Sequence, residues 1–358
     1  MPKRTIPILA FVVLVNLGIW AAFNRPQDEI AWHGVLRGVS FSPYQPGEDP
    51  LAGRFPTAQE IDRDLQAVAN RASRVRTYSS MDGMEQIPAL AKKYGLKVTA
   101  GAWVDTRADR NETEIRNLIR NARNQSNIER VIVGNEAILR GDVTVDQLNE
   151  YIKQVRRELP RRVKVSTAEP WNVWDANPAL AEEVDFIGIH MLPYWEGISL
   201  ESAVGHIQNR MQVLADKFPG KPLVIGEAGW PSEGRQRSAA EPSLANEAAF
   251  VRDFLTTAKD LNWDYYLLEA YDQPWKVEDE GAVGAFWGVY DAAGVQKFEF
   301  AGELSSLPDW PWFAAVAVII TTIGGALLLR TTPHLSFFGQ LFLAALAGLI
   351  VTGMIGVF

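Results

Sequence analysis

Residues 131–136 read Val-Ile-Val-Gly-Asn-Glu, and residues 223–227 read Leu-Val-Ile-Gly-Glu. Each stretch is a short, continuous apolar run that ends in a carboxylate. Runs of this kind are typical of strands in a parallel sheet, because helices cover both faces of such a sheet. We therefore interpret both stretches as buried parallel strands and place the rest of the chain around them.

Strand-like and helical patterns alternate along the chain on both sides of these two stretches. The predicted strands are residues 36–44, 74–78, 97–104, 130–136, 163–168, 185–191, 222–227 and 264–270. Amphipathic helical patterns fill residues 57–72, 84–94, 111–126, 144–159, 178–183, 200–218 and 243–261. Eight alternating units predict an α/β fold, the (β/α)8 TIM barrel. A doubly wound open sheet is the competing fold, but it requires a Gly-rich phosphate turn after its first strand, and residues 38–42 (Gly-Val-Ser-Phe-Ser) are not one.

Apolar stretches lie at both ends of the chain, at residues 6–23, 312–329 and 335–358. The first follows two basic residues and predicts an N-terminal membrane anchor, with a cleaved signal peptide as the alternative. The other two are joined by a short basic turn at 330–334 and predict a C-terminal transmembrane helical hairpin. The predicted domains are residues 1–30 for the anchor, 31–304 for the barrel and 305–358 for the two transmembrane helices.

The basic residues beside these stretches predict an orientation. Lys3, Arg4 and Arg330 are expected in the cytoplasm, because short cytoplasmic segments are enriched in Lys and Arg. The chain is then a multi-pass protein of the cytoplasmic (inner) membrane with its barrel on the periplasmic side. The last stretch ends without a flanking charge, so we also expect a truncated or divided longer protein.

Composition excludes several classes of function. The chain of 358 residues has no Cys, only 4 His and a formal net charge of −8. A cysteine nucleophile is excluded, a His-based metal site is not expected, and a basic nucleic-acid-binding surface is not expected either. The 12 Trp are unusual, because Trp is rare and its flat ring stacks well on sugars. Core packing and membrane-interface anchoring account for some of them.

Two carboxylates stand out by position. Glu136 ends the fourth predicted strand and Glu227 ends the seventh, so both should point into the open mouth of the barrel. Two acids about 5–5.5 Å apart are what retaining cleavage of a glycosidic bond requires, whereas a wider gap implies inversion. The alternative is that either acid is only a structural hydrogen-bonding group.

The residues around these acids resemble glycoside hydrolase family 17, the β-1,3-glucanases and β-1,3-glucan transglycosylases. The motifs that carry the resemblance lie at 38–41, 76–78, 133–136, 226–232, 269–276 and 287–291, with Lys297. The resemblance implies that Glu136 is the acid/base, that Glu227 is the nucleophile and that Asn135 binds the sugar 2-hydroxyl. It also implies that Glu269 and Lys276 are supporting polar residues near the site.

The chain differs from the plant enzymes of this family at several positions, and it also resembles a group of bacterial membrane proteins. Ala228 stands where the plant enzymes usually carry Thr, and residues 190–195 differ from their tyrosine-rich stretch, so plant-like subsites are not implied. The flanking apolar stretches are foreign to plant enzymes. They make the chain similar to the N-terminal part of bacterial membrane β-glucan synthases, in which a domain of this family precedes a glycosyltransferase.

Aromatic residues follow several predicted strands and could stack on a glucan chain. They are Trp103, Trp171, Trp174, Trp195, Trp230 and Trp275. We expect sugar contacts from Trp195 and Trp275 above all, with loop packing as the alternative. Tyr78, Tyr194 and His190 are further candidates, His190 as a hydrogen-bond partner of Glu227. For Glu169 we expect a solvated loop charge, with a further subsite acid as the alternative. For the Arg-rich run at 71–76 we expect solvated helix faces and barrel-bottom turns.

The sequence therefore predicts a membrane-tethered, retaining glycoside hydrolase or transglycosylase that acts on β-1,3-glucan. No metal or cofactor is needed, because two carboxylates suffice. Expected partners are a β-glucan, the lipid bilayer and a glycosyltransferase or glucan synthase. The alternatives are a non-catalytic glucan-binding barrel and the hydrolase-like part of a membrane β-glucan synthase. We favour a sugar over water as the acceptor.

Overall fold

The computed structural model describes residues 4–24, 30–304, 307 and 309–355. The chain divides into two compact units. The barrel unit is Glu29–Gly302, and the helical unit combines Met1–Asp28 with Glu303–Phe358.

Eight parallel strands close the barrel unit in the order of the sequence. They are β1 (Val39–Ser40), β2 (Arg74–Arg76), β3 (Lys97–Ala102), β4 (Ile128–Asn135), β5 (Lys164–Pro170), β6 (Ile187–Met191), β7 (Leu223–Ala228) and β8 (Asp264–Leu267). Closure comes from β1 and β8, where Val39 pairs with Leu267. The predicted TIM barrel is confirmed.

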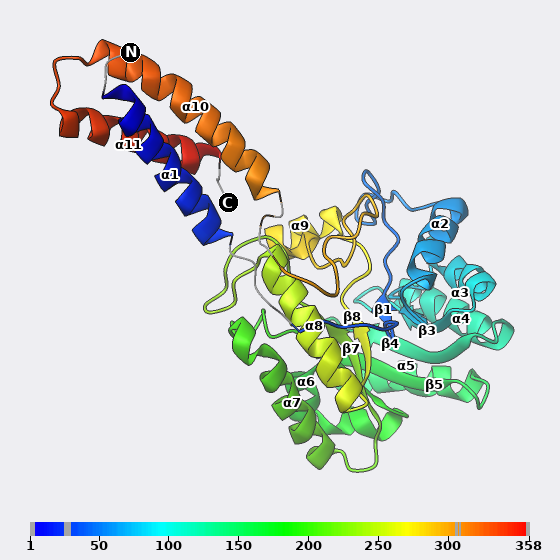
Figure 1. Cartoon of the computed structure of the whole chain (residues 1–358). Helices are drawn as coiled ribbons and strands as arrows, with labels where there is room; N and C mark the ends of the chain where they lie inside the picture. The colour runs from blue at the N-terminus through cyan, green and yellow to red at the C-terminus, as the bar shows by residue number, and fades with distance from the viewer. Residues whose placement is uncertain (1–3, 25–29, 305–306, 308, 356–358) are drawn as a thin grey trace. The chain divides into compact units, whose positions relative to one another are not determined.

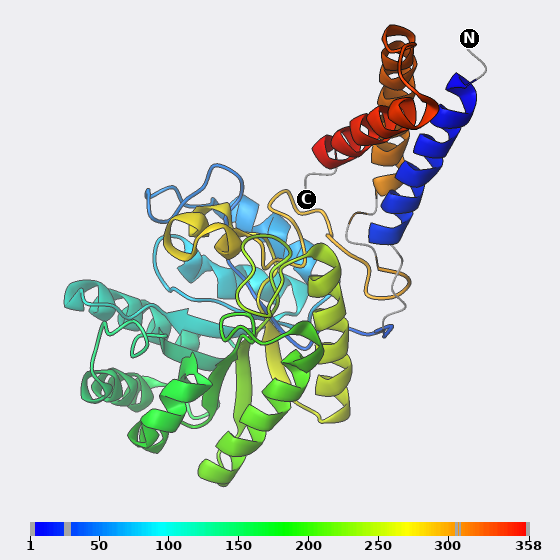
Figure 2. The ribbon, with the colours of Figure 1, turned by 90° about the vertical axis from the view of Figure 1, so that its left-hand side faces the viewer.

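Helices lie outside the strands (Figures 1 and 2). They are α2 (Ala58–Ala69), α3 (Ile87–Ala91), α4 (Ala108–Asn124), α5 (Val145–Glu158), α6 (Trp171–Ala176), α7 (Leu200–Lys217), α8 (Leu244–Asp260) and α9 (Val277–Glu280). Capping boxes start two of them, Thr57 with Glu60 at α2 and Thr144 with Gln147 at α5.

Two predicted helices differ from the structure. The pattern at 84–94 predicts one helix, but the structure has a 3-10 turn (Met84–Gln86), the short α3 and a second 3-10 turn (Lys92–Tyr94). Pro88 lacks a backbone N–H and lies near the start of α3, so a continuous helix cannot run through it. The segment Pro178–Glu183 is likewise a 3-10 helix.

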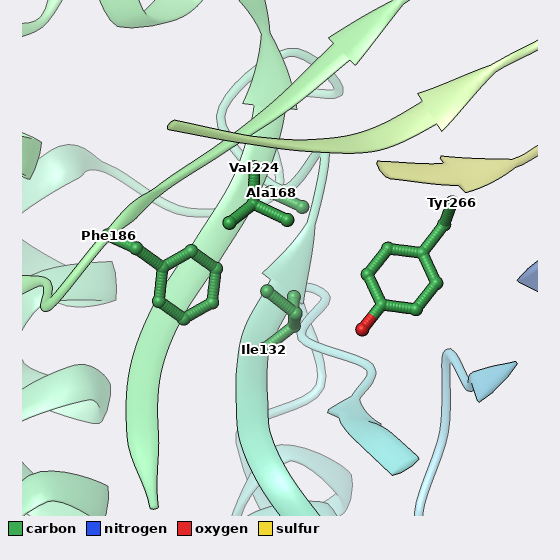
Figure 3. Packing of buried hydrophobic residues seen from close by; sticks show 5 residues of the cluster. All are labelled: Ile132, Ala168, Phe186, Val224 and Tyr266. Carbon is green, nitrogen blue, oxygen red and sulfur yellow. The ribbon is translucent and has the colours of Figure 1, made fainter. Parts of the chain in front are cut away.

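Apolar side chains fill the inside of the barrel. Ile132, Ala168, Phe186, Val224 and Tyr266 form one buried cluster between the strands (Figure 3). The Tyr266 hydroxyl is satisfied by Thr99 Oγ1 at 2.6 Å. Because the interior is packed, the open space for a ligand lies at the carboxyl ends of the strands.

The helical unit contains three long apolar helices, α1 (Thr5–Phe23), α10 (Trp310–Thr331) and α11 (Phe337–Ile355). Each is long and apolar enough to cross a membrane. They pack on one another through a cluster that includes Ile8, Leu329 and Ala344. In addition, Thr352 Oγ1 donates to Asn16 Oδ1 at 2.6 Å, which joins α11 to α1. The expected apolar spans are therefore present as helices at both ends of the chain.

Candidate active site

The two acids predicted from the sequence meet at the mouth of the barrel. Glu136 directly follows β4, and Glu227 is the last residue but one of β7. Three atoms lie within 4.8 Å of one another: one carboxylate oxygen of Glu136, one of Glu227 and a ring nitrogen of His190. The structure therefore brings together the pair that the strand ends predicted, with His190 of β6 between them.

His190 lies between the two acids and is nearer to Glu136 than to Glu227. Its Nδ1 lies 2.7 Å from Glu136 Oε1, and its Nε2 lies 3.2 Å from Arg76 Nη2 and 3.4 Å from Glu227 Oε1. Arg is always a donor, so Nε2 is the accepting nitrogen in the neutral ring and Nδ1 donates its proton to Glu136. Glu136 is thus the nearer partner of His190, and the predicted hydrogen bond to Glu227, across 3.4 Å, stays a prediction.

Arg76, at the end of β2, is buried and holds Glu227. Its Nη1 donates to Glu227 Oε1 at 2.8 Å and to the Gly226 carbonyl at 2.9 Å, and its Nη2 donates to Asn135 Oδ1 at 2.5 Å. Its side chain is 1% exposed. The prediction of a solvated surface charge was wrong for this residue, because residue 76 is an inward position of a very short strand.

The positive groups around Glu227 set its protonation state. Burial alone would raise the pKa of Glu227, but the charge of His190 when it is protonated, and the charges of Arg76 and Lys276, outweigh burial. The pKa of Glu227 is therefore held below its usual value. Glu227 is an ionised carboxylate at neutral pH.

Glu136 occupies an unusual backbone conformation. Its φ is +54° and that of Gly134 is +82°, a left-handed region that side chains with a Cβ seldom adopt. The Glu136 amide donates to the Ala168 carbonyl of β5 at 2.8 Å, and the Glu136 carbonyl accepts from the Arg140 amide at 2.9 Å. The side chain stays 24% exposed, so a substrate can reach it.

Glu269 and Lys276, predicted as supporting residues, form a buried ion pair of 2.5 Å. Burial raises the pKa of Glu269 to about 7, against the opposing charge of Lys276. The Arg76 guanidinium lies 4.9 Å from the ring centroid of Tyr78. These residues surround Glu227 with fixed charge and an aromatic surface.

Trp195 and Trp275 are half-buried. Trp195 stacks on Trp287 with centroids 6.0 Å apart, and Arg237 lies 5.5 Å from its centroid. The Trp275 Nε1 donates to Gln273 Oε1 at 2.7 Å. Both rings are fixed in orientation, as a stacking surface for a sugar requires.

Other aromatic candidates are core residues. Trp230 is 0% exposed, its Nε1 donates to the Glu241 carbonyl at 3.0 Å, and its ring packs on Phe250. Tyr194 is 2% exposed and donates to the Arg235 carbonyl at 2.5 Å. Neither offers a face to a sugar, which corrects the expectation for both. Buried Trp and Tyr need a partner for their polar atom, and here that partner is a loop carbonyl.

The remaining indoles divide between core and surface. Trp174 is buried, and its Nε1 donates to the Gly188 carbonyl at 2.7 Å. Guanidinium groups lie over the other two rings, that of Arg140 at 4.3 Å from Trp103 and that of Arg210 at 4.0 Å from Trp171.

Glu169 was expected to be a solvated charge, and the structure contradicts this. It is 0% exposed and accepts the amides of Ile138 at 2.8 Å and Leu139 at 3.2 Å. A signal was present in the sequence, because Glu169 follows the apolar end of a strand just as Glu136 does. Arg76 likewise stood near the end of a predicted strand, 74–78, and in the motif at 76–78.

The side chains of Glu136, His190 and Glu227 are of types that also bind metals. However, Arg76 already donates to Glu227 Oε1, and a cation at that oxygen would be repelled by the guanidinium. The arrangement fits a pair of catalytic carboxyl groups better than a metal centre.

Comparison with known proteins finds similar chains among fungal glucosidases. A glucan 1,3-β-glucosidase of Arthroderma benhamiae is 27% identical over 276 residues, covering 72% of this chain and 89% of that protein. One of Saccharomyces cerevisiae is 24% identical over 277 residues, covering 71% of this chain and 88% of that protein. These relatives are fungal, so the bacterial, membrane-anchored aspect of the resemblance stays a prediction.

A solved structure agrees in fold and in family. The Rhizomucor miehei β-1,3-glucanosyltransferase of glycoside hydrolase family 17 is 27% identical, with a TM-score of 0.66 over 75% of this chain and 98% of that one. The family model of the BtgE/BtgC glycoside hydrolase domain matches residues 38–288. The chain therefore belongs to the BtgE/BtgC glycoside hydrolase domain family, a family of glycosidases and glucanosyltransferases.

Proposed function

We propose that this chain is a retaining, β-1,3-glucan-active glycosidase and glucanosyltransferase in which Glu227 is the nucleophile and Glu136 the acid/base. The observation that carries the proposal is the approach of the two carboxylates, with oxygens within 4.8 Å across His190. That spacing is nearer to the roughly 5–5.5 Å of retaining enzymes than to the wider gap, about 6.5–9.5 Å, in which an inverting enzyme places a water between its two acids.

The surroundings of the two acids support the division of roles. A nucleophile must be ionised, and the buried contact with Arg76 keeps Glu227 so. An acid/base must reach the leaving oxygen and exchange protons, and Glu136 is the more exposed of the two. Asn135 lies beside both, oriented by Arg76, where it can bind a sugar hydroxyl.

The reaction proceeds in two displacements. A Glu227 oxygen attacks the anomeric carbon, the glycosidic bond breaks and the leaving oxygen takes the proton of Glu136. In the second step Glu136 removes a proton from the acceptor hydroxyl, whose oxygen attacks the anomeric carbon and displaces Glu227. Water as acceptor gives hydrolysis, and a sugar hydroxyl gives transfer.

Transfer is the outcome that we favour. A sugar competes with water when acceptor subsites bind and orient it, and the half-buried rings of Trp195 and Trp275 can serve as such surfaces. The Rhizomucor miehei neighbour is a glucanosyltransferase. A fixed aromatic surface for an acceptor supports elongation of a glucan over its digestion.

A single-length substrate tests this choice. The full chain in detergent is incubated with one linear β-1,3-gluco-oligosaccharide, and the products are separated by size. Products longer than the starting sugar are expected. If only shorter sugars form across a wide range of substrate concentration, the chain is a hydrolase and the transfer proposal fails.

We also propose that the barrel unit acts outside the cytoplasmic membrane. Three helices that could span a membrane flank it in the sequence, and the basic residues Lys3, Arg4 and Arg330 favour a cytoplasmic position for the segments that carry them. The bilayer is then a permanent partner. A nascent glucan from a membrane-bound synthase is the substrate that such a position favours.

A further inference from the structure

Glu169 is a buried carboxylate that takes no part in the two displacements. It lies on β5 and is 0% exposed. Its Oε1 accepts the amide of Ile138 at 2.8 Å, and its Oε2 accepts the amide of Leu139 at 3.2 Å. These two amides come directly after Glu136 and Ala137 in the chain, so Glu169 holds the start of the turn that follows β4.

The backbone on the other side of Glu136 is held by the residue before Glu169. The Ala168 carbonyl accepts the Glu136 amide at 2.8 Å. Consecutive residues of β5 therefore hold the chain immediately before and after the Glu136 side chain. This matters because Glu136 has a φ of +54°, a conformation that persists only where its surroundings impose it.

The turn is also attached on the side of β3, where Arg140 Nη2 donates to the Val104 carbonyl at 2.9 Å, but its remaining backbone bonds are internal. The Asp142 amide donates to the Ala137 carbonyl at 3.0 Å, and the Gly141 amide donates to the Ile138 carbonyl at 3.0 Å. These bonds close the turn on itself and do not attach it to the barrel. The attachment to β5 rests on the Ala168 carbonyl and on the two oxygens of Glu169.

We propose that Glu169 is the positioning residue for Glu136, fixing the direction from which the acid/base delivers its proton. Glu169 makes no contact with substrate. The inference rests on the proposed role of Glu136. A carboxylate is suited to the task because it accepts two amides with two oxygens, whereas a Gln amide would turn its NH₂ group towards one of them.

The electrostatics are consistent with this task. Burial raises the pKa of Glu169 to about 7, while the two amide donors and His190 act in the opposite direction and Glu136 adds to the increase. The amides of Ile138 and Leu139 thus favour the charged form that accepts both of them.

A comparison of two donors tests the proposal. The full chain in detergent is given the 2,4-dinitrophenyl and the phenyl β-glycosides of laminaritriose, and first-turnover phenol release is followed. The dinitrophenyl group leaves without a proton, whereas the phenyl group needs one. The ratio of the two rates does not depend on how much of a variant is folded, so it reports on proton delivery.

Glu169→Gln should lower the rate with the phenyl donor by about tenfold or more, which is part of the 10²–10⁴ that general acid catalysis contributes in full, and should leave the dinitrophenyl rate almost unchanged. Glu136→Gln should change the ratio in the same direction and by more. Glu247→Gln is the matched control, since Glu247 is also a buried carboxylate but pairs with Lys297. It should leave the ratio at the wild-type value.

The outcomes separate the inference from the function on which it rests. If Glu136→Gln shifts the ratio and Glu169→Gln does not, Glu169 is not a positioning residue and the role of Glu136 stands. If neither variant shifts the ratio, Glu136 is not the acid and both assignments are overturned.

Discussion

Glu227 is ionised because buried positive groups surround it. Arg76 contributes most directly, through a contact of 2.8 Å between two side chains that are 1% and 7% exposed. Removing one partner of a buried ion pair is costly, because the other charge is left without compensation. Arg76 also orients Asn135, so one guanidinium prepares both the nucleophile and a sugar-binding amide.

Substitution of Arg76 tests this at the residue scale. Arg76→Met should raise the pKa of Glu227, since it removes a charge that lowers it. The nucleophile is lost as pH falls through that pKa, so the acid limb of the kcat/KM profile should move to higher pH. We expect a loss on the order of 100-fold in kcat/KM at neutral pH, as when a preorganised charge-stabilising donor is removed.

Arg76→Lys is the conservative control. It keeps the positive charge but cannot contact Glu227 and Asn135 at once. The acid limb should therefore stay close to its wild-type pH, while kcat/KM should remain reduced. An unchanged acid limb in Arg76→Met would show that Arg76 does not control the ionisation of Glu227.

The sequence predicted the catalytic acids better than the residues around them. Glu136 and Glu227 end apolar strands, and strand ends point to the barrel mouth. Nothing in the pattern separates a Trp whose ring reaches the surface from one that packs beneath it. Trp195 and Trp230 both follow strands, yet only Trp230 is buried, because α8 supplies Phe250 to cover it. Long-range contacts of this kind have no local signature.

Close approach of neighbouring backbone shapes the strands at the barrel mouth. Gly101 lies near the end of β3, and a Cβ at this position would come within 2.8 Å of Tyr78 Cα and would overlap the Thr77 carbonyl. Only glycine fits there. Tyr78 can therefore lie beside Arg76 only because the neighbouring residue of β3, Gly101, has no side chain.

Gly101→Ala should destabilise the barrel by about 1–3 kcal/mol through overpacking, because the segment that carries Tyr78 must move. The measurement is urea unfolding of the full chain in detergent, followed by the near-UV signal of the barrel. Gly205→Ala is the control, since Gly205 lies in α7 with nothing within 4 Å of a new Cβ. It should be neutral or stabilising, and equal effects of the two variants would contradict the packing argument.

Element types were predicted well where a pattern was long and poorly where it was short. The strongly amphipathic stretches became α4 and α5, with ends near those predicted. The pattern at 84–94 is divided into three pieces, and Pro88 accounts for the first division because it lacks a backbone N–H near the start of α3. β1 and β2 are far shorter than their predicted stretches, since side-chain pattern does not report where two neighbouring backbones stop pairing.

Across the whole barrel unit, several buried carboxyl groups have a pKa that burial raises above its ordinary value. Burial raises the pKa of Glu114, Glu169 and Glu269 to about 7 and that of Glu247 to about 8. In an unfolded chain each would titrate near its ordinary value of about 4.3. Protonation of these carboxyl groups therefore stabilises the folded state. This stabilisation is fully present below about pH 4.3 and is lost as pH rises through about 7 to 8.

The urea midpoint of the barrel should accordingly fall as pH is raised from about 5 to about 8. Glu227 does not offset this trend, because its lowered pKa removes stability only at more acidic pH. Glu247→Gln should reduce the slope, since the variant no longer titrates. A midpoint that rises with pH in this window would contradict the assignment.

The proposed membrane topology can be tested without background labelling, because the chain has no Cys. Gln208→Cys places a thiol at an exposed position of α7, and Thr331→Cys places one at the exposed end of α10. Intact spheroplasts are treated with a membrane-impermeant maleimide. The cysteine at position 208 should react directly, whereas the cysteine at position 331 should react only after the membrane is permeabilised. The reverse pattern would place the barrel in the cytoplasm.

The central claim is that Glu227 forms a covalent bond to the substrate while Glu136 moves the proton. The most direct measurement is mass spectrometric mapping of the adduct left by a 2-deoxy-2-fluoro β-1,3-glucosyl donor with an activated leaving group. The account predicts one glycosyl group per chain, on the peptide that contains Glu227, and no adduct in Glu227→Gln. A label on Glu136, or an active enzyme that forms no adduct and releases product of inverted configuration, would contradict it.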